Sequence, residues 1–175
     1  MDDHARFERL YQGYAGAVLT FARRRTSPSE AEDVVAEVFL AAWRRLEEVP
    51  ADPLPWLLGI ARGALSNRRR GAERSSALIA RLREVEPTVP VGAEVRTPDG
   101  RVLQALGRLA PTDQELLLLV AWEQLNRRQV AEALGTSVGT VAVRLHRARR
   151  RLARALNARP AARSHETPES EEVVR

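Results

Sequence analysis

Apolar residues recur every three or four positions along most of this chain, and that helical spacing limits the folds open to it. The helix expected at Arg6–Arg25 has one apolar face, made of Phe7, Leu10, Tyr14, Ala17, Val18 and Phe21. No stretch alternates apolar and polar residues with period two for long enough to indicate a β-strand. The sequence therefore predicts an all-α protein.

Two further helices are expected in the first part of the chain. Ser29 begins one of them, and Glu32 follows at the spacing of a capping box. That helix should end near Glu48, because prolines follow at positions 50, 53 and 55. The other helix, 55–70, begins at Pro55 or Trp56, since the first helical turn tolerates proline.

The composition changes over residues 71–99, which are rich in proline and glycine and contain one short expected helix, Ser76–Glu84. Four helices are expected after this stretch: Arg101–Leu109, Asp113–Glu123, Asn126 or Arg127 to Gly135, and Ser137–Asn157. The sequence thus predicts two small helical domains, 1–74 and 100–157. A flexible linker at 75–99 joins them, and a disordered tail follows at 158–175.

Positive charge is concentrated in the second domain. All 28 basic residues are arginine, and the formal net charge is +5. Residues 100–155 contain ten arginines and four acidic residues, and the segment Val138–Arg154 contains six arginines and no acidic residue. Solvated helix faces usually interleave both signs, so this distribution favours binding to a polyanion.

Residues 126–152 have the spacing of a helix-turn-helix. Ala131 is small where two helices would cross, and Gly135 can adopt the positive φ that ends a helix in a tight turn. The start of the second helix would enter the DNA major groove. Its first two turns carry Thr140, Ala142, Val143 and Arg144, and the arginines nearer the flanking phosphates are Arg147, Arg149, Arg150 and Arg151. An ordinary helical hairpin shares this spacing, but the uncompensated arginines favour DNA.

Several other functions are disfavoured. The chain has no cysteine, which excludes disulfides, thiolate catalysis, zinc fingers and iron–sulfur clusters. Asp33 and Glu37 lie four apart on one helix face and could hold a metal, although the pattern favours an acidic docking face or a solvated face. No glycine-rich phosphate loop occurs. We therefore expect a non-enzymatic cytoplasmic protein with no cofactor, no metal and no membrane span.

Three segments carry a family resemblance: SEAEDVVAEVFLAAWRRL (29–46), PWLLGIARGALSNRRR (55–70) and SVGTVAVRLHRARRRL (137–152). They resemble, in that order, region 2.2, regions 2.3–2.4 and region 4.2 of the extracytoplasmic-function group of the bacterial sigma-70 family. The resemblance implies a transcription initiation factor. It would bind core RNA polymerase and direct it to promoters through their −10 and −35 elements.

The resemblance also assigns three groups of site residues. The surface facing the β′ clamp coiled coil of polymerase would comprise Asp33, Glu37, Leu40 and Arg44. The −10 element would be read by Trp56, Asn67, Arg68 and Arg69. The −35 element would be bound by Ser137, Thr140, Ala142, Val143, Arg144, Arg147 and Arg149. Region 4 would touch the β flap, and an anti-sigma factor is a further expected partner.

The sequence departs from the family pattern at three places. Ala142 and Val143 stand where the family commonly has a basic residue and then serine, so −35 recognition is expected to differ. Apolar contact with a thymine methyl is one substitute. Gly63 replaces a frequent asparagine, and Thr136 stands where an apolar residue is common in the turn.

Two alternatives remain open from the sequence. An autonomous helix-turn-helix repressor or activator would share the second domain but not the first. The domain arrangement is also undecided. A 25-residue linker spans at most about 80–90 Å, enough for two DNA sites roughly 70 Å apart, and a compact form with the two domains packed together is equally possible.

Overall fold

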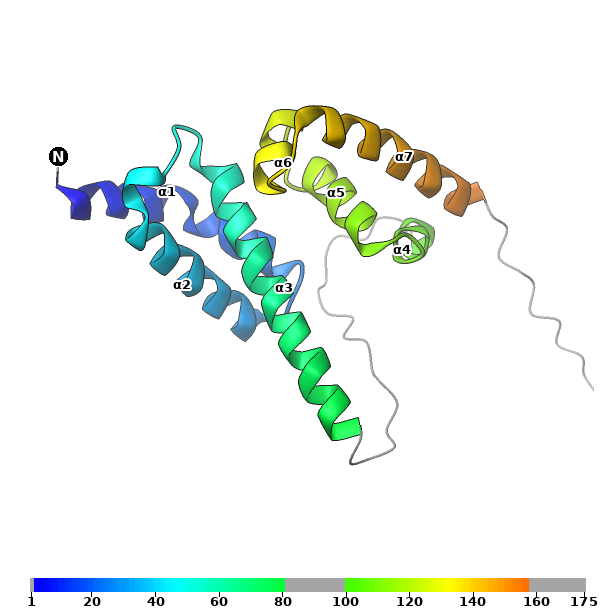
Figure 1. Cartoon of the computed structure of the whole chain (residues 1–175), viewed down its shortest axis with the longest axis horizontal. Helices are drawn as coiled ribbons and strands as arrows, with labels where there is room; N and C mark the ends of the chain where they lie inside the picture. The colour runs from blue at the N-terminus through cyan, green and yellow to red at the C-terminus, as the bar shows by residue number, and fades with distance from the viewer. Residues whose placement is uncertain (1, 81–99, 158–175) are drawn as a thin grey trace, which may run out of the picture.

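The computed structural model describes residues 2–80 and 100–157, and every regular element in these ranges is helical (Figure 1). The elements are α1 (Asp3–Arg23), α2 (Pro28–Arg44), the 3₁₀ turn η1 (Leu46–Glu48), α3 (Pro53–Ala80), α4 (Gly100–Gly107), α5 (Pro111–Ala121), α6 (Arg127–Ala133) and α7 (Val138–Asn157). The prediction of an all-α protein is confirmed. Among the described helices, none is long and apolar enough to cross a membrane.

The first body consists of α1, α2 and α3, packed around an apolar core (Figure 1). Each helix contributes one apolar stripe to that core, as its periodicity predicts. The largest buried side chains of this body are Val18, Phe21, Val34, Val38, Phe39, Leu57 and Leu58.

The start of α2 differs from the sequence prediction. The capping box is Ser27 and Glu30, two positions earlier than expected, and Pro28 occupies the first helical position. The Glu30 backbone N–H donates to Ser27 Oγ at 3.4 Å, and the Ser27 N–H donates to Glu30 Oε2 at 3.3 Å. Hydrogen bonds from the side chains of Thr26 and Ser27 lower the pKa of Glu30. The helix also ends at Arg44, earlier than predicted, and η1 follows it.

Helix α3 is longer than expected. It begins at Pro53 and continues past Gly71 to Ala80, so positions 75–80 of the predicted linker are helical. A single interior glycine costs a helix only about 1 kcal/mol, which does not end it. The short helix predicted at Ser76–Glu84 is therefore the end of α3 as far as Ala80. Residues 81–99, and the predicted tail at 158–175, lie outside the described residues.

The second body contains the predicted helix-turn-helix, formed by α6 and α7. Gly135 has φ of 60°, as expected for a left-handed residue that ends a helix. The Gly135 N–H donates to the Glu132 carbonyl at 3.0 Å, and the Thr136 N–H donates to the Ala131 carbonyl at 2.9 Å. These two bonds form a Schellman motif, so backbone geometry sets the turn between the helices.

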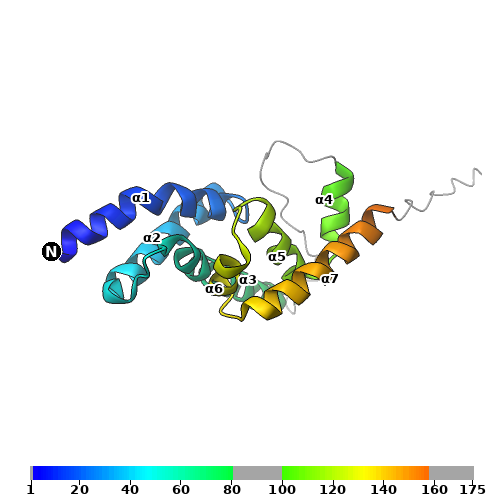
Figure 2. The ribbon, with the colours of Figure 1, turned by 90° about the horizontal axis from the view of Figure 1, so that it is seen from above.

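The interior of the second body joins all of its helices. Its buried apolar side chains include Leu116, Leu119, Leu125, Val130, Val141, Leu145 and Ala148. Both bodies belong to one continuous cluster of buried residues, because α6 packs against α3 (Figure 2). The structure is thus the compact form that the sequence left open.

Candidate nucleic-acid and polymerase interface

Helix α7 separates an apolar face from an exposed face. Val141, Leu145 and Ala148 are buried in the second body. The predicted −35 residues lie at the helix start or along the rest of its surface; Ser137, Thr140, Val143, Arg147 and Arg149 are exposed, and Ala142 and Arg144 are half-buried. This arrangement leaves an arginine-rich surface available to DNA phosphates.

The N-terminus of α7 is capped by a hydroxyl pair. The Thr140 backbone N–H donates to Ser137 Oγ at 3.1 Å, and the two side-chain hydroxyls lie 2.9 Å apart. The remaining free N–H groups at this end carry the positive pole of the helix dipole, which favours an anion nearby. The cap therefore fixes the end of α7 that a helix-turn-helix presents to DNA.

Arg151 does not have the role expected from the sequence. It was predicted to lie near the flanking phosphates, but its Nη1 forms an ion pair with Asp113 Oδ2 at the start of α5. Asp113 is buried, with 5% exposure. A buried carboxylate needs a partner, so Arg151 holds α7 against α5.

The predicted −10 residues lie along α3 and vary in their surroundings. Trp56 is half-buried, and the guanidinium of Arg45 lies 5.5 Å from its ring centroid. Arg45 also bonds to Glu48, and this hydrogen bond lowers the pKa of Glu48. Further along the helix, Arg70 Nη2 donates to Asn67 Oδ1 at 2.6 Å. Arg45 thus holds the segment before α3 beside the ring of Trp56 at the start of the helix, whereas Asn67 and Arg70 lie about three turns further along.

Arg68 connects two of the predicted surfaces. Its guanidinium lies 3.3 Å from Asp33 Oδ2 and 3.5 Å from Glu37 Oε2, both on α2. Its Nε is buried and has no hydrogen-bond partner within the described part of the chain. These contacts also explain Asp33 and Glu37 as partners of a cation rather than as metal ligands. Arg68 is therefore a link between α2 and α3, in addition to being a predicted DNA contact.

The face of α2 that carries Asp33, Glu37, Leu40 and Arg44 is exposed. Leu40 is 50% exposed, which is high for a large apolar side chain between charged neighbours. The four residues share one side of the helix, because they are spaced four, three and four apart. The structure thus presents all four on a single surface.

An aromatic cluster beside this face was not predicted from the sequence. The rings of Phe7 and Trp43 lie 5.1 Å apart, and those of Tyr11 and Phe39 lie 4.8 Å apart. Tyr11 and Trp43 remain 46% and 43% exposed. The signal that could have revealed the cluster is the pair of aromatic residues four apart on each of the two helices, α1 and α2.

Comparison with known proteins identifies both bodies. Residues 10–75 match the family model "Sigma-70 region 2", and residues 99–152 match "Sigma-70, region 4". The RNA polymerase sigma factor NccH of Alcaligenes xylosoxydans xylosoxydans is 30% identical over 160 residues, 86% of each chain. The ECF RNA polymerase sigma factor SigL of Mycobacterium tuberculosis is 30% identical over 149 residues, 82% of this chain and 84% of SigL.

A solved structure supports the same assignment. The structure of CnrH in complex with the cytosolic domain of CnrY has a TM-score of 0.58 and 26% sequence identity to this chain. The match covers 88% of this chain and 89% of CnrH.

The all-helical fold, the arginine-rich helix α7 and the matches to regions 2 and 4 together define a transcription factor that recognises promoters. The chain belongs to the extracytoplasmic-function group of the sigma-70 family. It is a sigma factor for promoter-specific initiation of transcription, and it is a non-enzymatic subunit of RNA polymerase. Family membership decides against the autonomous repressor.

Proposed function

We propose that three surfaces of this sigma factor each bind a different partner during promoter-directed initiation. The exposed face of α2 binds core polymerase, the part of α3 from Trp56 to Arg69 takes the −10 element, and α7 binds the −35 element. The single observation that carries the proposal is that α7 has one buried apolar face and one exposed arginine-rich face. It buries Val141 and Leu145 while presenting arginines without any acidic residue on the same helix.

The docking surface comprises Asp33, Glu37, Leu40 and Arg44, and its partner is the β′ clamp coiled coil. The exposure of Leu40 and the alternation of charge around it support this role. An apolar centre within a charged rim is typical of a protein–protein contact. The adjacent exposed rings of Tyr11 and Trp43 extend the apolar part of the surface.

The DNA-binding residues are assigned to two helices. Trp56, Asn67 and Arg69 form the −10 surface on α3, and Arg68 supports them from its position beside α2. Ser137, Thr140, Ala142, Val143, Arg144, Arg147 and Arg149 form the −35 surface on α7. Since Ala142 and Val143 are apolar, we infer that this part of α7 contacts thymine methyl groups. The β flap is the polymerase partner of this body.

We also infer that an anti-sigma protein regulates this chain in the cytoplasm, where promoter DNA is found. The support is the relative CnrH, whose solved structure is a complex with the cytosolic domain of CnrY. A regulator that competes with polymerase should lose affinity when Leu40 is changed, because Leu40 is the exposed apolar centre of α2.

Transcription start sites on fragments of the source genome, mapped with purified core polymerase and this chain, test the proposed function. Asp33→Arg and Leu40→Asp should abolish binding to core polymerase without unfolding the protein. The matched control is Glu32→Arg, which makes the same charge change on α2 but on a different face, where Glu32 pairs with Arg23 at 3.6 Å. Normal holoenzyme formation by both docking variants would refute the assignment.

A further inference from the structure

We propose that the acidic segment 166–172 of this chain binds the exposed arginines of α7 in the free sigma factor and competes there with DNA. The inference rests on the proposed −35 surface, because the segment would cover part of the same helix. It names a contact within one chain, formed before polymerase and promoter are bound.

Three arginines form a continuous stripe along the solvent side of α7. Arg147, Arg150 and Arg154, which we call the arginine stripe, are spaced three and four positions apart and so lie one above another on the helix. All three are exposed, whereas Val141 and Leu145 on the opposite side are buried. In residues 2–80 and 100–157, no carboxylate pairs with any arginine of the stripe. The stripe is therefore open to an anionic partner.

The second body holds few carboxylates that could balance this charge. Residues 100–157 contain ten arginines and four acidic residues. One of the four, Asp113, already pairs with Arg151. Another, Glu132, is exposed on α6 and has no arginine partner among the described residues.

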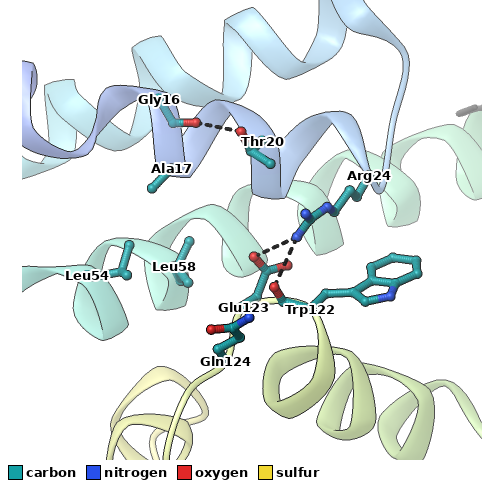
Figure 3. A pocket seen from close by; sticks show the side chains of 9 residues that line it. All are labelled: Gly16, Ala17, Thr20, Arg24, Leu54, Leu58, Trp122, Glu123 and Gln124. Carbon is teal, nitrogen blue, oxygen red and sulfur yellow. Dashed lines mark hydrogen bonds and ion pairs between the residues drawn. The ribbon is translucent and has the colours of Figure 1, made fainter. Parts of the chain in front are cut away.

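The other two acidic residues face the first body. Glu115 Oε2 lies 3.3 Å from Arg25 Nε, and Glu123 Oε2 lies 3.1 Å from Arg24 Nη1, at the junction between the two bodies. Figure 3 shows the pair of Arg24 and Glu123 beside a cavity of about 300 Å³, which is lined by α1, α3 and the segment after α5. The carboxylates of the second body thus leave most of the charge on α7 uncompensated.

Negative charge follows α7 in the sequence. The segment 164–174, which lies outside the described residues, contains four glutamates and no arginine. The four are Glu166, Glu169, Glu171 and Glu172. Clusters of like charge beyond a folded domain are often interaction segments. The charge of this segment is opposite to that of the helix it follows.

The length of chain after α7 suits a contact with the arginine stripe. Nine residues, 158–166, lead from the last residue of α7, Asn157, to Glu166. Without regular structure, as predicted for the tail, nine residues span about 15–18 Å on average. Arg147 lies ten positions before Asn157, which is about 15 Å along a helix. The acidic segment can therefore reach the stripe without stretching the chain.

The tether makes a weak electrostatic contact effective. Exposed ion pairs are individually weak, and salt screens them. A short tether, however, holds the two charged segments at an effective concentration of about 1 mM or more. DNA carries a longer and denser row of negative charge than four glutamates do. Promoter DNA bound by holoenzyme should therefore displace the segment, whereas random DNA that meets the free sigma factor must compete with it.

The first experiment measures how tightly the free, full-length chain binds a duplex of random sequence. The test variant changes all four glutamates of segment 166–172 to glutamine. Its affinity should be about three- to tenfold higher than that of wild type at about 50 mM salt, because the internal competitor is lost. The difference should vanish towards about 300 mM salt, since screening weakens the internal contact in wild type. Wild type should therefore show the shallower dependence of affinity on salt.

The matched control removes the same number of negative charges from the first body. It combines four substitutions at exposed positions: Asp3→Asn, Glu8→Gln, Glu32→Gln and Glu47→Gln. Its net charge equals that of the test variant, but the acidic segment is intact. Its affinity for the random duplex should stay within about twofold of wild type, because net charge alone acts weakly through screened solvent.

The second experiment locates the acidic segment. The chain has no cysteine, so Ser170→Cys places a single spin label within the segment. At low salt the label should broaden the NMR signals of backbone amides from Thr140 to Arg147, and the four-glutamine variant should lose most of this broadening. A mixture of spin-labelled protein with unlabelled nitrogen-15 protein should show none, because the contact forms within one chain.

Three results would overturn the inference: equal affinity of wild type and the four-glutamine variant for the random duplex, an equal gain in the control variant, or broadening of α7 in the mixture, which would indicate contact between two copies. The proposed −35 contacts are tested separately with Arg147→Ala, which should also reduce the broadening. Unchanged promoter binding by holoenzyme with this variant would count against the −35 assignment and leave the internal contact in place.

Discussion

The ion pair of Asp113 and Arg151 yields a prediction in which the two partners behave differently. Asp113 lies in the first turn of α5 and is 5% exposed, whereas the Arg151 side chain is 57% exposed. Replacing Arg151 leaves a buried carboxylate without its cation. Replacing Asp113 leaves an arginine that water can solvate. The cost in unfolding free energy should therefore depend on which partner is removed.

The structure sets the size of each effect. Removing one partner of a fully buried ion pair costs about 3–5 kcal/mol, and the exposure of Arg151 reduces this to about 2 kcal/mol for Arg151→Met, which keeps most of the aliphatic stem. Asp113→Ala removes the buried charge and loses its favourable position at the helix N-terminus, about 0.5–1 kcal/mol. The double variant should be about as stable as Asp113→Ala, because Arg151 then has no buried charge to neutralise.

Urea unfolding followed by circular dichroism measures these differences, and thermal unfolding provides a check. For a chain of this size, 1 kcal/mol corresponds to a change in Tm of about 2–4 °C, so Arg151→Met should lower Tm by about 4–8 °C. The same variant should leave the salt dependence of promoter binding by holoenzyme unchanged, since Arg151 contacts Asp113 rather than a phosphate. Equal costs for the two single variants, or a reduced salt dependence for Arg151→Met, would refute the reasoning.

Four further predictions concern the helix caps and the DNA-binding helix α7. Arg147→Ala should reduce the slope of log affinity against log salt by about 1 for promoter binding by holoenzyme, because one phosphate contact is lost. Gly135→Ala should destabilise the protein by about 1–2 kcal/mol in urea unfolding, since its φ of 60° is unfavourable for a residue with a Cβ, and Gly135→Asn should cost less. Ser27→Ala should cost about 1 kcal/mol through the lost cap. Glu30, whose pKa is lowered in the folded protein, stabilises it above the ordinary carboxyl pKa and loses that contribution as the pH falls through the lowered value. Unfolding of wild type and Glu30→Gln should therefore converge in acid.

Helical periodicity and turn chemistry predicted most of the fold. The apolar stripes of α1, α2 and α7 determine which faces are buried, and Gly135 ends α6 as its position indicated. The local sequence pattern predicted the wrong first residue for α2, because two capping boxes are available there. Ser27 and Ser29 are each followed three positions later by a glutamate, and the proline at position 28 favours the earlier cap.

The roles of individual arginines could not be predicted from local pattern. Arg68 and Arg151 each sit in a run of arginines, and both were predicted to lie near DNA. Their carboxylate partners, Asp33 and Asp113, are 35 and 38 positions away. Only tertiary packing brings such pairs together, and the junction between Gly59 and Ala133 is likewise absent from any local periodicity.

The Schellman turn at Gly135 has a consequence for how promoter preference can change. The angle of α7 depends on backbone hydrogen bonds and on its inward side chains, Val141, Leu145 and Ala148. Apart from Arg151, which pairs with Asp113 on α5, the outward positions contribute almost nothing to that angle. Substitutions there can therefore change the DNA sequence that α7 prefers while the turn and the packing that hold the helix stay intact. Related factors can thus diverge in the genes they serve without first losing stability.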